Sequence, residues 1–146
     1  MPNDKQIRDV MTPNPACVSA KDSIRDVAKI MAREDTGVVP VVDGKKVIGM
    51  ITDRDIVVRL VAEGKDPANA KVNEAMTKNV RSVKEDSTIN EALQVMSNAQ
   101  IRRVPVVNTN NEIVGIVSMK DIATDSKDTG KVGKTVEKIS EGPANN

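Results

Sequence analysis

Two copies of a short motif carry side chains suited to ligand chemistry in this 146-residue sequence. The copies are Thr52-x-x-Asp55 and Ser118-x-x-Asp121, each a hydroxyl followed one helical turn later by a carboxylate. A carboxylate offers two acceptor oxygens, which suits paired hydroxyls such as those of a ribose. The same motif is also a helix cap that is worth about 1 kcal/mol without any ligand. Its recurrence does not separate the two interpretations, because a duplicated cap would recur as well.

Basic residues accompany both motifs. Arg54 and Lys120 hold matching places in the first turn of the expected helices, where a cation opposes the helix dipole. A cation that opposes the dipole in both helices indicates that it contacts phosphate or a partner. Alternatively, the second cation was simply inherited by duplication. The pair Arg102-Arg103 precedes the apolar run of the second copy, whereas the first copy has Gly37-Val38 there. A solvated strand edge or a salt bridge is the structural alternative for these arginines.

Other functional classes lack the residues that they need. The sequence has no His, no aromatic residue and a single cysteine, Cys17. Because His is the commonest general base and metal ligand, we expect neither an enzyme nor a metal site. Balanced charge, 22 Lys+Arg against 21 Asp+Glu, and missing aromatic rings argue against nucleic-acid binding. With no long apolar run and no signal peptide pattern, we expect a cytoplasmic protein without membrane association.

The elements that must position these motifs come from an internal duplication. Met11-Thr12 recurs as Met76-Thr77, and Val39-Pro40-Val41-Val42 recurs as Val104-Pro105-Val106-Val107. After one inserted residue in the second copy, Gly49 and Asp55 of the first copy match Gly115 and Asp121. A duplication of this length predicts two units of one fold.

Each copy predicts the order β-α-β-β-α. Short strands at residues 17–19 and 82–84 precede amphipathic helices, whose apolar stripes begin at Ile24 and Ile89. Pairs of β-branched strands follow, at residues 38–42 and 47–52 and at residues 104–107 and 112–118, and second helices begin near Arg54 and Lys120. We expect repeats at residues 5–62 and 72–124, a linker at 63–71, and a polar tail at 125–146 with room for one short helix.

The segments Gly49-Met-Ile-Thr52-Asp-Arg-Asp55 and Gly115-Ile-Val-Ser118-Met-Lys-Asp121 resemble the signature of CBS domains. Each follows an apolar-Pro strand, Val39-Pro40 or Val104-Pro105, as in that family. The resemblance covers residues 5–124 and is to a CBS-domain pair (Bateman module) of the small stand-alone type found in bacterial stress responses. It implies an α/β (α+β) fold of two tandem β-α-β-β-α repeats related by a pseudo-twofold axis.

The resemblance also implies a function. CBS pairs of this kind bind adenosine-containing ligands (AMP, ADP, ATP or S-adenosylmethionine) in clefts between the repeats and transmit the bound state to a partner protein. No cofactor is required, and homodimers are expected. The alternative is a ligand-free dimeric scaffold or a protein-interaction module.

By this likeness, phosphate is expected at Arg102, Arg103, Arg54 and Lys120, and ribose or phosphate at Thr52, Asp55, Ser118 and Asp121. Adenine would have to lie on aliphatic surface, because the sequence has no ring to stack on it. The candidates for this surface are Cys17, Val18, Val39 and Pro40 in the first copy and Ser82, Val83, Val104 and Pro105 in the second. Ordinary core packing is the alternative for the valines.

Overall fold

A computed structural model describes residues 5–125, which form two compact units that cross the boundary between the sequence copies. Pro15–Val80 form one unit, here called the first-copy unit. Within the described range, residues 5–14 and 81–125 form the other, here called the second-copy unit. Beyond Asp125, the expected polar tail and its short helix lie outside the described residues.

The first-copy unit has a three-stranded sheet in the order β2 (Val38–Asp43), β3 (Lys46–Thr52) and β4 (Thr77–Lys78). Helix α1 (Ile24–Glu34) begins where the Ser23 hydroxyl accepts a hydrogen bond from the Asp26 amide. Helix α2 (Asp53–Ile56) continues into a π-helical segment, Val57–Val61. Both helical segments supply the core of this unit, because Val27 of α1 and Leu60 of the π-helical segment are fully buried in one apolar cluster.

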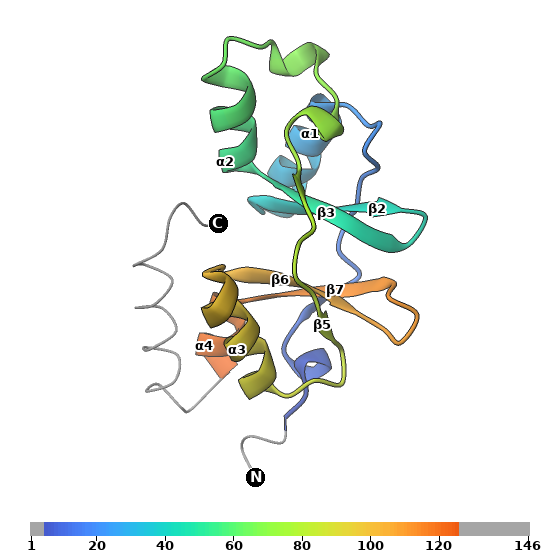
Figure 1. Ribbon diagram of the computed structural model, residues 1–146, viewed down its shortest axis with the longest axis vertical. Helices are drawn as coiled ribbons and strands as arrows, with labels where there is room; N and C mark the ends of the chain where they lie inside the picture. The colour runs from blue at the N-terminus through green and yellow to red at the C-terminus, as the bar shows by residue number, and fades with distance from the viewer. Residues whose placement is uncertain (1–4, 126–146) are drawn as a thin grey trace. The chain divides into compact units, whose positions relative to one another are not determined.

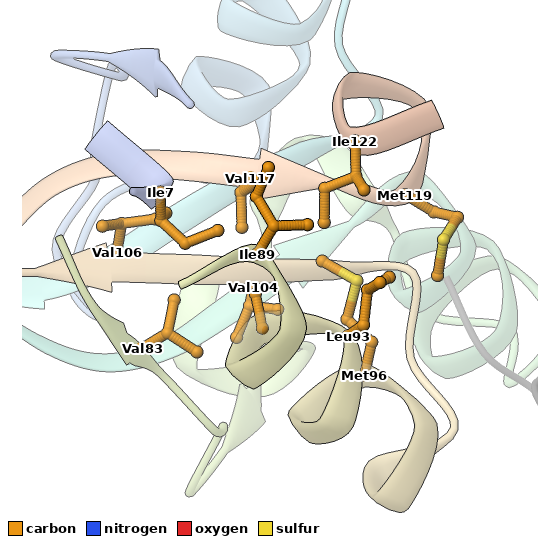
Figure 2. Packing of buried hydrophobic residues seen from close by; sticks show 11 residues of the cluster. Ile7, Val83, Ile89, Leu93, Met96, Val104, Val106, Val117, Met119 and Ile122 are labelled. Carbon is orange, nitrogen blue, oxygen red and sulfur yellow. The ribbon is translucent and has the colours of Figure 1, made fainter. Parts of the chain in front are cut away.

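The second-copy unit has a four-stranded sheet in the order β1 (Thr12–Pro13), β7 (Ile113–Ser118), β6 (Arg103–Val107) and β5 (Val83–Lys84). Helices α3 (Ile89–Ala99) and α4 (Met119–Asp125) complete it. Its core joins Met96 of α3 and Ile122 of α4 to Ile7, which belongs to a short 3-10 turn near the chain start (Figure 2). The N-terminal segment, blue in Figure 1, is therefore part of the fold of the second copy.

The Met-Thr segments near the start of the two repeats pair across the duplication. Strand β1 lies antiparallel to β7, with Thr12 opposite Ile116, although the hairpin of β6 and β7 belongs to the second copy. Strand β4 lies antiparallel to β3 of the first copy, with Thr77 opposite Met50. Each leading segment thus completes the sheet of the other repeat.

Two signature glycines make this pairing possible. A Cβ atom on Gly49 would lie 2.5 Å from the carbonyl oxygen of Thr77. A Cβ atom on Gly115 would lie 2.9 Å from the carbonyl oxygen of Thr12. Real Cβ atoms do not come so close to backbone, so the glycines allow β4 and β1 to approach their partner strands.

The predicted β-α-β-β-α order is confirmed, with differences at the short elements. The strand expected at residues 17–19 is reduced to one parallel bridge between Val18 and Val41, whereas its counterpart forms β5. The expected linker contains a 3-10 turn, Pro67–Asn69, and ends against the core because Ala70 is buried. Within residues 5–125, no helix has the length and apolarity needed to cross a membrane.

Candidate ligand site

The two hydroxyl-carboxylate motifs form the same reciprocal helix cap. The amide of Thr52 donates to Asp55 Oδ2 at 3.0 Å, and the amide of Asp55 donates to Thr52 Oγ1 at 3.0 Å. Ser118 and Asp121 repeat both bonds, also at 3.0 Å. The capping role is therefore present in each copy, and it occupies one carboxylate oxygen of each aspartate.

In the first copy the rest of the aspartate is also engaged. The hydroxyl of Thr77 donates to Asp55 Oδ1 at 3.3 Å, and Arg59 Nε lies 3.8 Å from the same oxygen. Arg59 is held there because its Nη1 also donates to the carbonyl of Met76 at 2.9 Å. Asp55 is only 8% exposed. A ligand at this carboxylate would have to displace partners that already satisfy it.

In the second copy the corresponding partners are missing. The place of Arg59 is taken by Asp125, whose carboxylate instead pairs with Lys5 at 2.9 Å. Thr12 replaces Thr77 and donates no side-chain hydrogen bond to Asp121. Among residues 5–125 no group donates to Asp121 Oδ1, and the side chain is half-buried. The second copy thus keeps an acceptor oxygen that the first copy has already used.

Arg103 is the second candidate of the second copy. It begins β6 directly opposite Ser118, the residue that caps α4. Its Nη1 atom is buried and has no hydrogen-bond partner in the part of the chain that the structure describes. A buried N–H without a partner is costly, and a guanidinium binds phosphate through two parallel hydrogen bonds. The corresponding residue of the first copy is Val38, opposite Thr52.

The other basic candidates are exposed. Arg102 has a solvent-exposed side chain, while its backbone carbonyl accepts a hydrogen bond from the Met119 amide at 2.7 Å. Arg54 and Lys120 project from the first turns of α2 and α4. None of these three side chains forms an ion pair or hydrogen bond with another residue of the range 5–125. They supply positive charge at the surface but no fixed geometry.

The expected adenine surface is largely interior. All four valines pack in the two cores, and Pro40 and Pro105 are buried too; the valines are Val18, Val39, Val83 and Val104. Cys17 is half-buried, its thiol donates to the carbonyl of Pro15 at 3.3 Å, and burial raises the pKa of that thiol. Ser82 is exposed. The side-chain surface of these segments therefore comes from Cys17 and Ser82.

Sequence reasoning missed the two residues that distinguish the copies. Arg59 stands four residues after Asp55, a spacing at which a helical ion pair is expected, and the second copy has an acid there. Thr77 gave no such signal, because its contact with Asp55 spans 22 residues and depends on the pairing of β4 with β3. Within the described range, no three His, Cys, Asp or Glu side chains gather as metal ligands.

Comparison with known proteins agrees with this architecture. The CBS domain family model matches residues 7–62 and 72–127. The CBS domain-containing protein YhcV of Bacillus subtilis is 36% identical over 134 residues, which cover 92% of this chain and 94% of the relative. Hypoxic response protein 1 of Mycobacterium tuberculosis is 38% identical over 117 residues, which cover 80% of this chain and 81% of the relative.

Solved structures are similar as well. The crystal structure of Hypoxic Response Protein I with two coordinated zinc ions has a TM-score of 0.74 and 36% identity, and covers 82% of this chain and 98% of that chain. The CBS domain pair of protein MJ0100, in complex with 5'-methylthioadenosine and S-adenosyl-L-methionine, has a TM-score of 0.73 and 31% identity, with the same coverage of 82% and 98%. The chain therefore belongs to the CBS domain family and carries a CBS pair, which is a regulatory module.

Proposed function

We propose that this CBS pair is a non-catalytic sensor, which binds one phosphorylated adenosine ligand per chain at its second copy and transmits the bound state to a partner protein. The observation that carries the proposal is the buried, unpartnered Nη1 atom of Arg103, opposite Ser118. The family supports the adenosyl part of the ligand, because the CBS pair of MJ0100 was crystallised with two adenosine derivatives.

Two groups of the second copy define the ligand chemistry. Asp121 Oδ1 is an acceptor for a ribose hydroxyl, since only Oδ2 is used by the cap. Arg103 is a donor for a phosphate, to which its guanidinium can bind bidentately. The exposed cations Arg102 and Lys120 raise the positive potential nearby. This combination favours AMP, ADP or ATP over adenosine derivatives that lack a phosphate.

The first copy offers a ligand neither a buried cation nor a free carboxylate oxygen. Val38 stands where the second copy has Arg103, and the carboxylate of Asp55 already accepts from Thr77 and faces Arg59. A phosphorylated ligand would find no buried cation there and would have to compete for the carboxylate. We expect one bound nucleotide per chain for this reason.

Signalling then follows if the nucleotide binds some conformations of the protein more tightly than others. A nucleotide that pairs with Arg103 stabilises the conformations in which the guanidinium and Asp121 face it together, and so shifts their population. A partner that binds the same conformations reads that shift. The regulatory unit is a homodimer; oligomers occur among related CBS proteins, one of which is described as hexameric.

The geometry of the first copy favours a second candidate function, in which the protein binds no ligand. Its cap and its aspartate are satisfied without a ligand, as in a ligand-free scaffold or protein-interaction module. If the second copy behaved in the same way, the chain would be an assembly protein. Ligand binding decides between the two functions.

A thermal-shift screen with AMP, ADP, ATP, S-adenosylmethionine and 5'-methylthioadenosine tests the proposal. The phosphorylated ligands should raise the melting temperature of the wild-type protein in a saturable way. Arg103→Val gives the second copy the residue of the first and should abolish most of that rise. If no ligand shifted the melting temperature at about millimolar concentration, any affinity would be weaker than a functional sensor needs. That result would favour the scaffold.

A further inference from the structure

Helix α1 of the first-copy unit (Figure 1) carries three cations in one row. Arg25, Lys29 and Arg33 are exposed and stand four residues apart, so they form one ridge along the helix. Successive cations lie about 6 Å apart along the helix axis. The buried residues Ile24 and Val27 belong to other rows of the same helix. We call the three cations the basic ridge.

The charge of the basic ridge is not neutralised within the described chain. Arg25 and Lys29 form no ion pair with another residue of the range 5–125, although an acid stands three residues before each of them. Arg33 contacts Glu34 at 3.7 Å, and both side chains are more than half exposed. An ion pair so open to water contributes little. The ridge therefore keeps its positive charge for another contact.

The fold itself does not need this charge. At the equivalent places of α3 the second copy has Asn90, Gln94 and Asn98. There the side-chain amide of Gln94 donates to Asn98 Oδ1 at 3.2 Å, which is an attractive contact between positions four residues apart. Like charges at that spacing repel each other and weaken a helix. The two repulsions in α1 add no core, which indicates that the cations serve a contact outside their own unit.

Two small side chains lie beside the basic ridge. Ala28 and Ala32 are exposed and form the next row of α1, whereas the second copy has Leu93 and Ser97 there, with Leu93 buried in its core. Rows of this kind are the ridges and grooves by which helices pack, and methyl groups let a second helix approach closely. A helix whose acids recur every four residues would set its carboxylates against the cations at the same spacing of about 6 Å.

The complementary acids do not come from the chain itself. None of the helices within residues 5–125 carries acids at three successive positions of that spacing. The residues beyond Asp125 hold more lysines than acids, so their charge does not match either. Nucleic acid and anionic lipid are poorer matches. The chain has no aromatic ring to stack on bases, and α1 packs its large apolar residues into the core and offers none to a membrane.

We infer that the basic ridge docks an acidic helix of a partner protein, with one carboxylate opposite each cation and with Ala28 and Ala32 as the contact surface. This inference rests on the partner protein of the proposed function and specifies the surface that this partner binds. The partner surface belongs to the first copy, whereas the proposed nucleotide site belongs to the second.

Fluorescence anisotropy of a labelled peptide tests the basic ridge on the full chain, at about 50 mM salt so that exposed charges are weakly screened. The probe is an alanine-based helix of about 20 residues with three glutamates at a spacing of four. Wild-type protein should bind it saturably with a dissociation constant below about 1 mM. A peptide of the same composition with its glutamates at a spacing of five, which spreads them around the helix, should bind roughly tenfold more weakly. Equal affinity for the two peptides, or no saturable binding below about 1 mM, overturns the inference.

Neutralising the basic ridge should remove the interaction without unfolding α1. The combined variant Arg25→Gln, Lys29→Gln and Arg33→Gln should bind the glutamate peptide roughly tenfold more weakly, and circular dichroism should show folded protein, because glutamine is a good helix former. Glutamate at the same three positions should reverse the preference, so that a peptide with lysine in place of glutamate binds instead. A reversed chain that binds neither peptide overturns the pairing of charges.

A matched control separates the basic ridge from net charge. The combined variant Lys45→Gln, Lys46→Gln and Lys78→Gln also removes three exposed cations of the first-copy unit, and it should keep the wild-type affinity within about twofold. An equal loss in this control and in the neutralised ridge overturns the inference.

Other occupants of the basic ridge have their own readouts. Duplex DNA or phosphatidylserine vesicles that bind through the ridge, where the glutamate peptide does not, would overturn the partner helix in favour of a phosphate surface. A weaker dimer of the neutralised variant in sedimentation equilibrium would make the ridge a contact between copies of this chain, which also overturns it.

The nucleotide half of the proposed function is tested separately. The neutralised variant should bind ADP as the wild type does, because the nucleotide site belongs to the second copy. ADP binding without peptide binding would overturn the basic ridge and leave the sensor standing. Peptide binding without ADP binding would contradict the sensor and support the ridge.

Discussion

Arg103 lies directly opposite Ser118 across β6 and β7, with its Nη1 atom buried and without a hydrogen-bond partner in residues 5–125. The first copy has Val38 opposite Thr52 at the same register. One duplicated framework thus holds a cation at one hydroxyl cap and an aliphatic side chain at the other. The difference between these two positions is the basis of the proposed ligand site.

Replacing Arg103 should separate binding from stability. Arg103→Val removes the buried N–H that lacks a partner, so the unliganded protein should be as stable as the wild type or more stable, by up to about 1 kcal/mol. Affinity for ADP should fall at least tenfold, roughly the value of a charge-assisted hydrogen bond. Urea denaturation and calorimetric titration measure the two effects, and a large loss of stability would show that Arg103 is a structural residue.

The two capping aspartates should respond differently to the same substitution. Asp55→Ala removes the cap, the bond from Thr77 and the charge facing Arg59, so it should cost about 2–3 kcal/mol of unfolding free energy. Asp121→Ala removes only the cap and should cost about 1 kcal/mol. Unlike Asp55→Ala, the Asp121→Ala variant should also lose nucleotide binding. Equal stability losses in urea denaturation would contradict the difference between the copies.

Adding one methyl group at a signature glycine should weaken the sheet that it faces. In Gly49→Ala the new Cβ would meet the Thr77 carbonyl, which is backbone and cannot move alone, so we expect a loss of about 2–3 kcal/mol. Gly37→Ala is the control, because its Cβ would meet only the side chain of Asp53, at 3.0 Å, which can rotate away. Thermal melting of both variants should rank Gly49→Ala far below Gly37→Ala.

Cys17 should react slowly with thiol reagents at neutral pH. Burial raises the pKa of its thiol, and the thiolate is the reactive form. The rate of alkylation should therefore be lower than that of a free cysteine at pH 8 and should keep rising at pH values where the free thiol has levelled off. Unfolding in urea should remove the difference, and equal rates in the folded and unfolded protein would contradict the burial effect.

Local patterns in the sequence predicted the fold because they report local physics. The two amphipathic helices form where their apolar stripes begin, at Ile24 and Ile89, and Ser23 and Thr88 cap them. Both β-hairpins form where β-branched runs flank a turn. The two-residue strands β1 and β4 were not predicted, because segments so short show no periodicity. Their exchange between the copies was equally hidden, since duplicated Met-Thr segments fit either hairpin by sequence alone.

The candidate site was predictable only in part, because sequence patterns report local structure and not contacts between distant segments. The residue types of Arg103 and Asp121 could be read from the sequence, but their burial and unmet hydrogen bonds could not. The engagement of Asp55 depends on Thr77, which reaches it from a strand of another segment. Spacing along the chain carries no information about such a contact.

The stoichiometry of ADP binding tests the central claim most directly. Isothermal titration calorimetry of the full chain should give one ADP per chain, with Asp121→Ala and Arg103→Val each reducing the affinity at least tenfold, about 1.4 kcal/mol. Two equivalent sites per chain, or an affinity unchanged in both variants, would contradict a ligand site confined to the second copy.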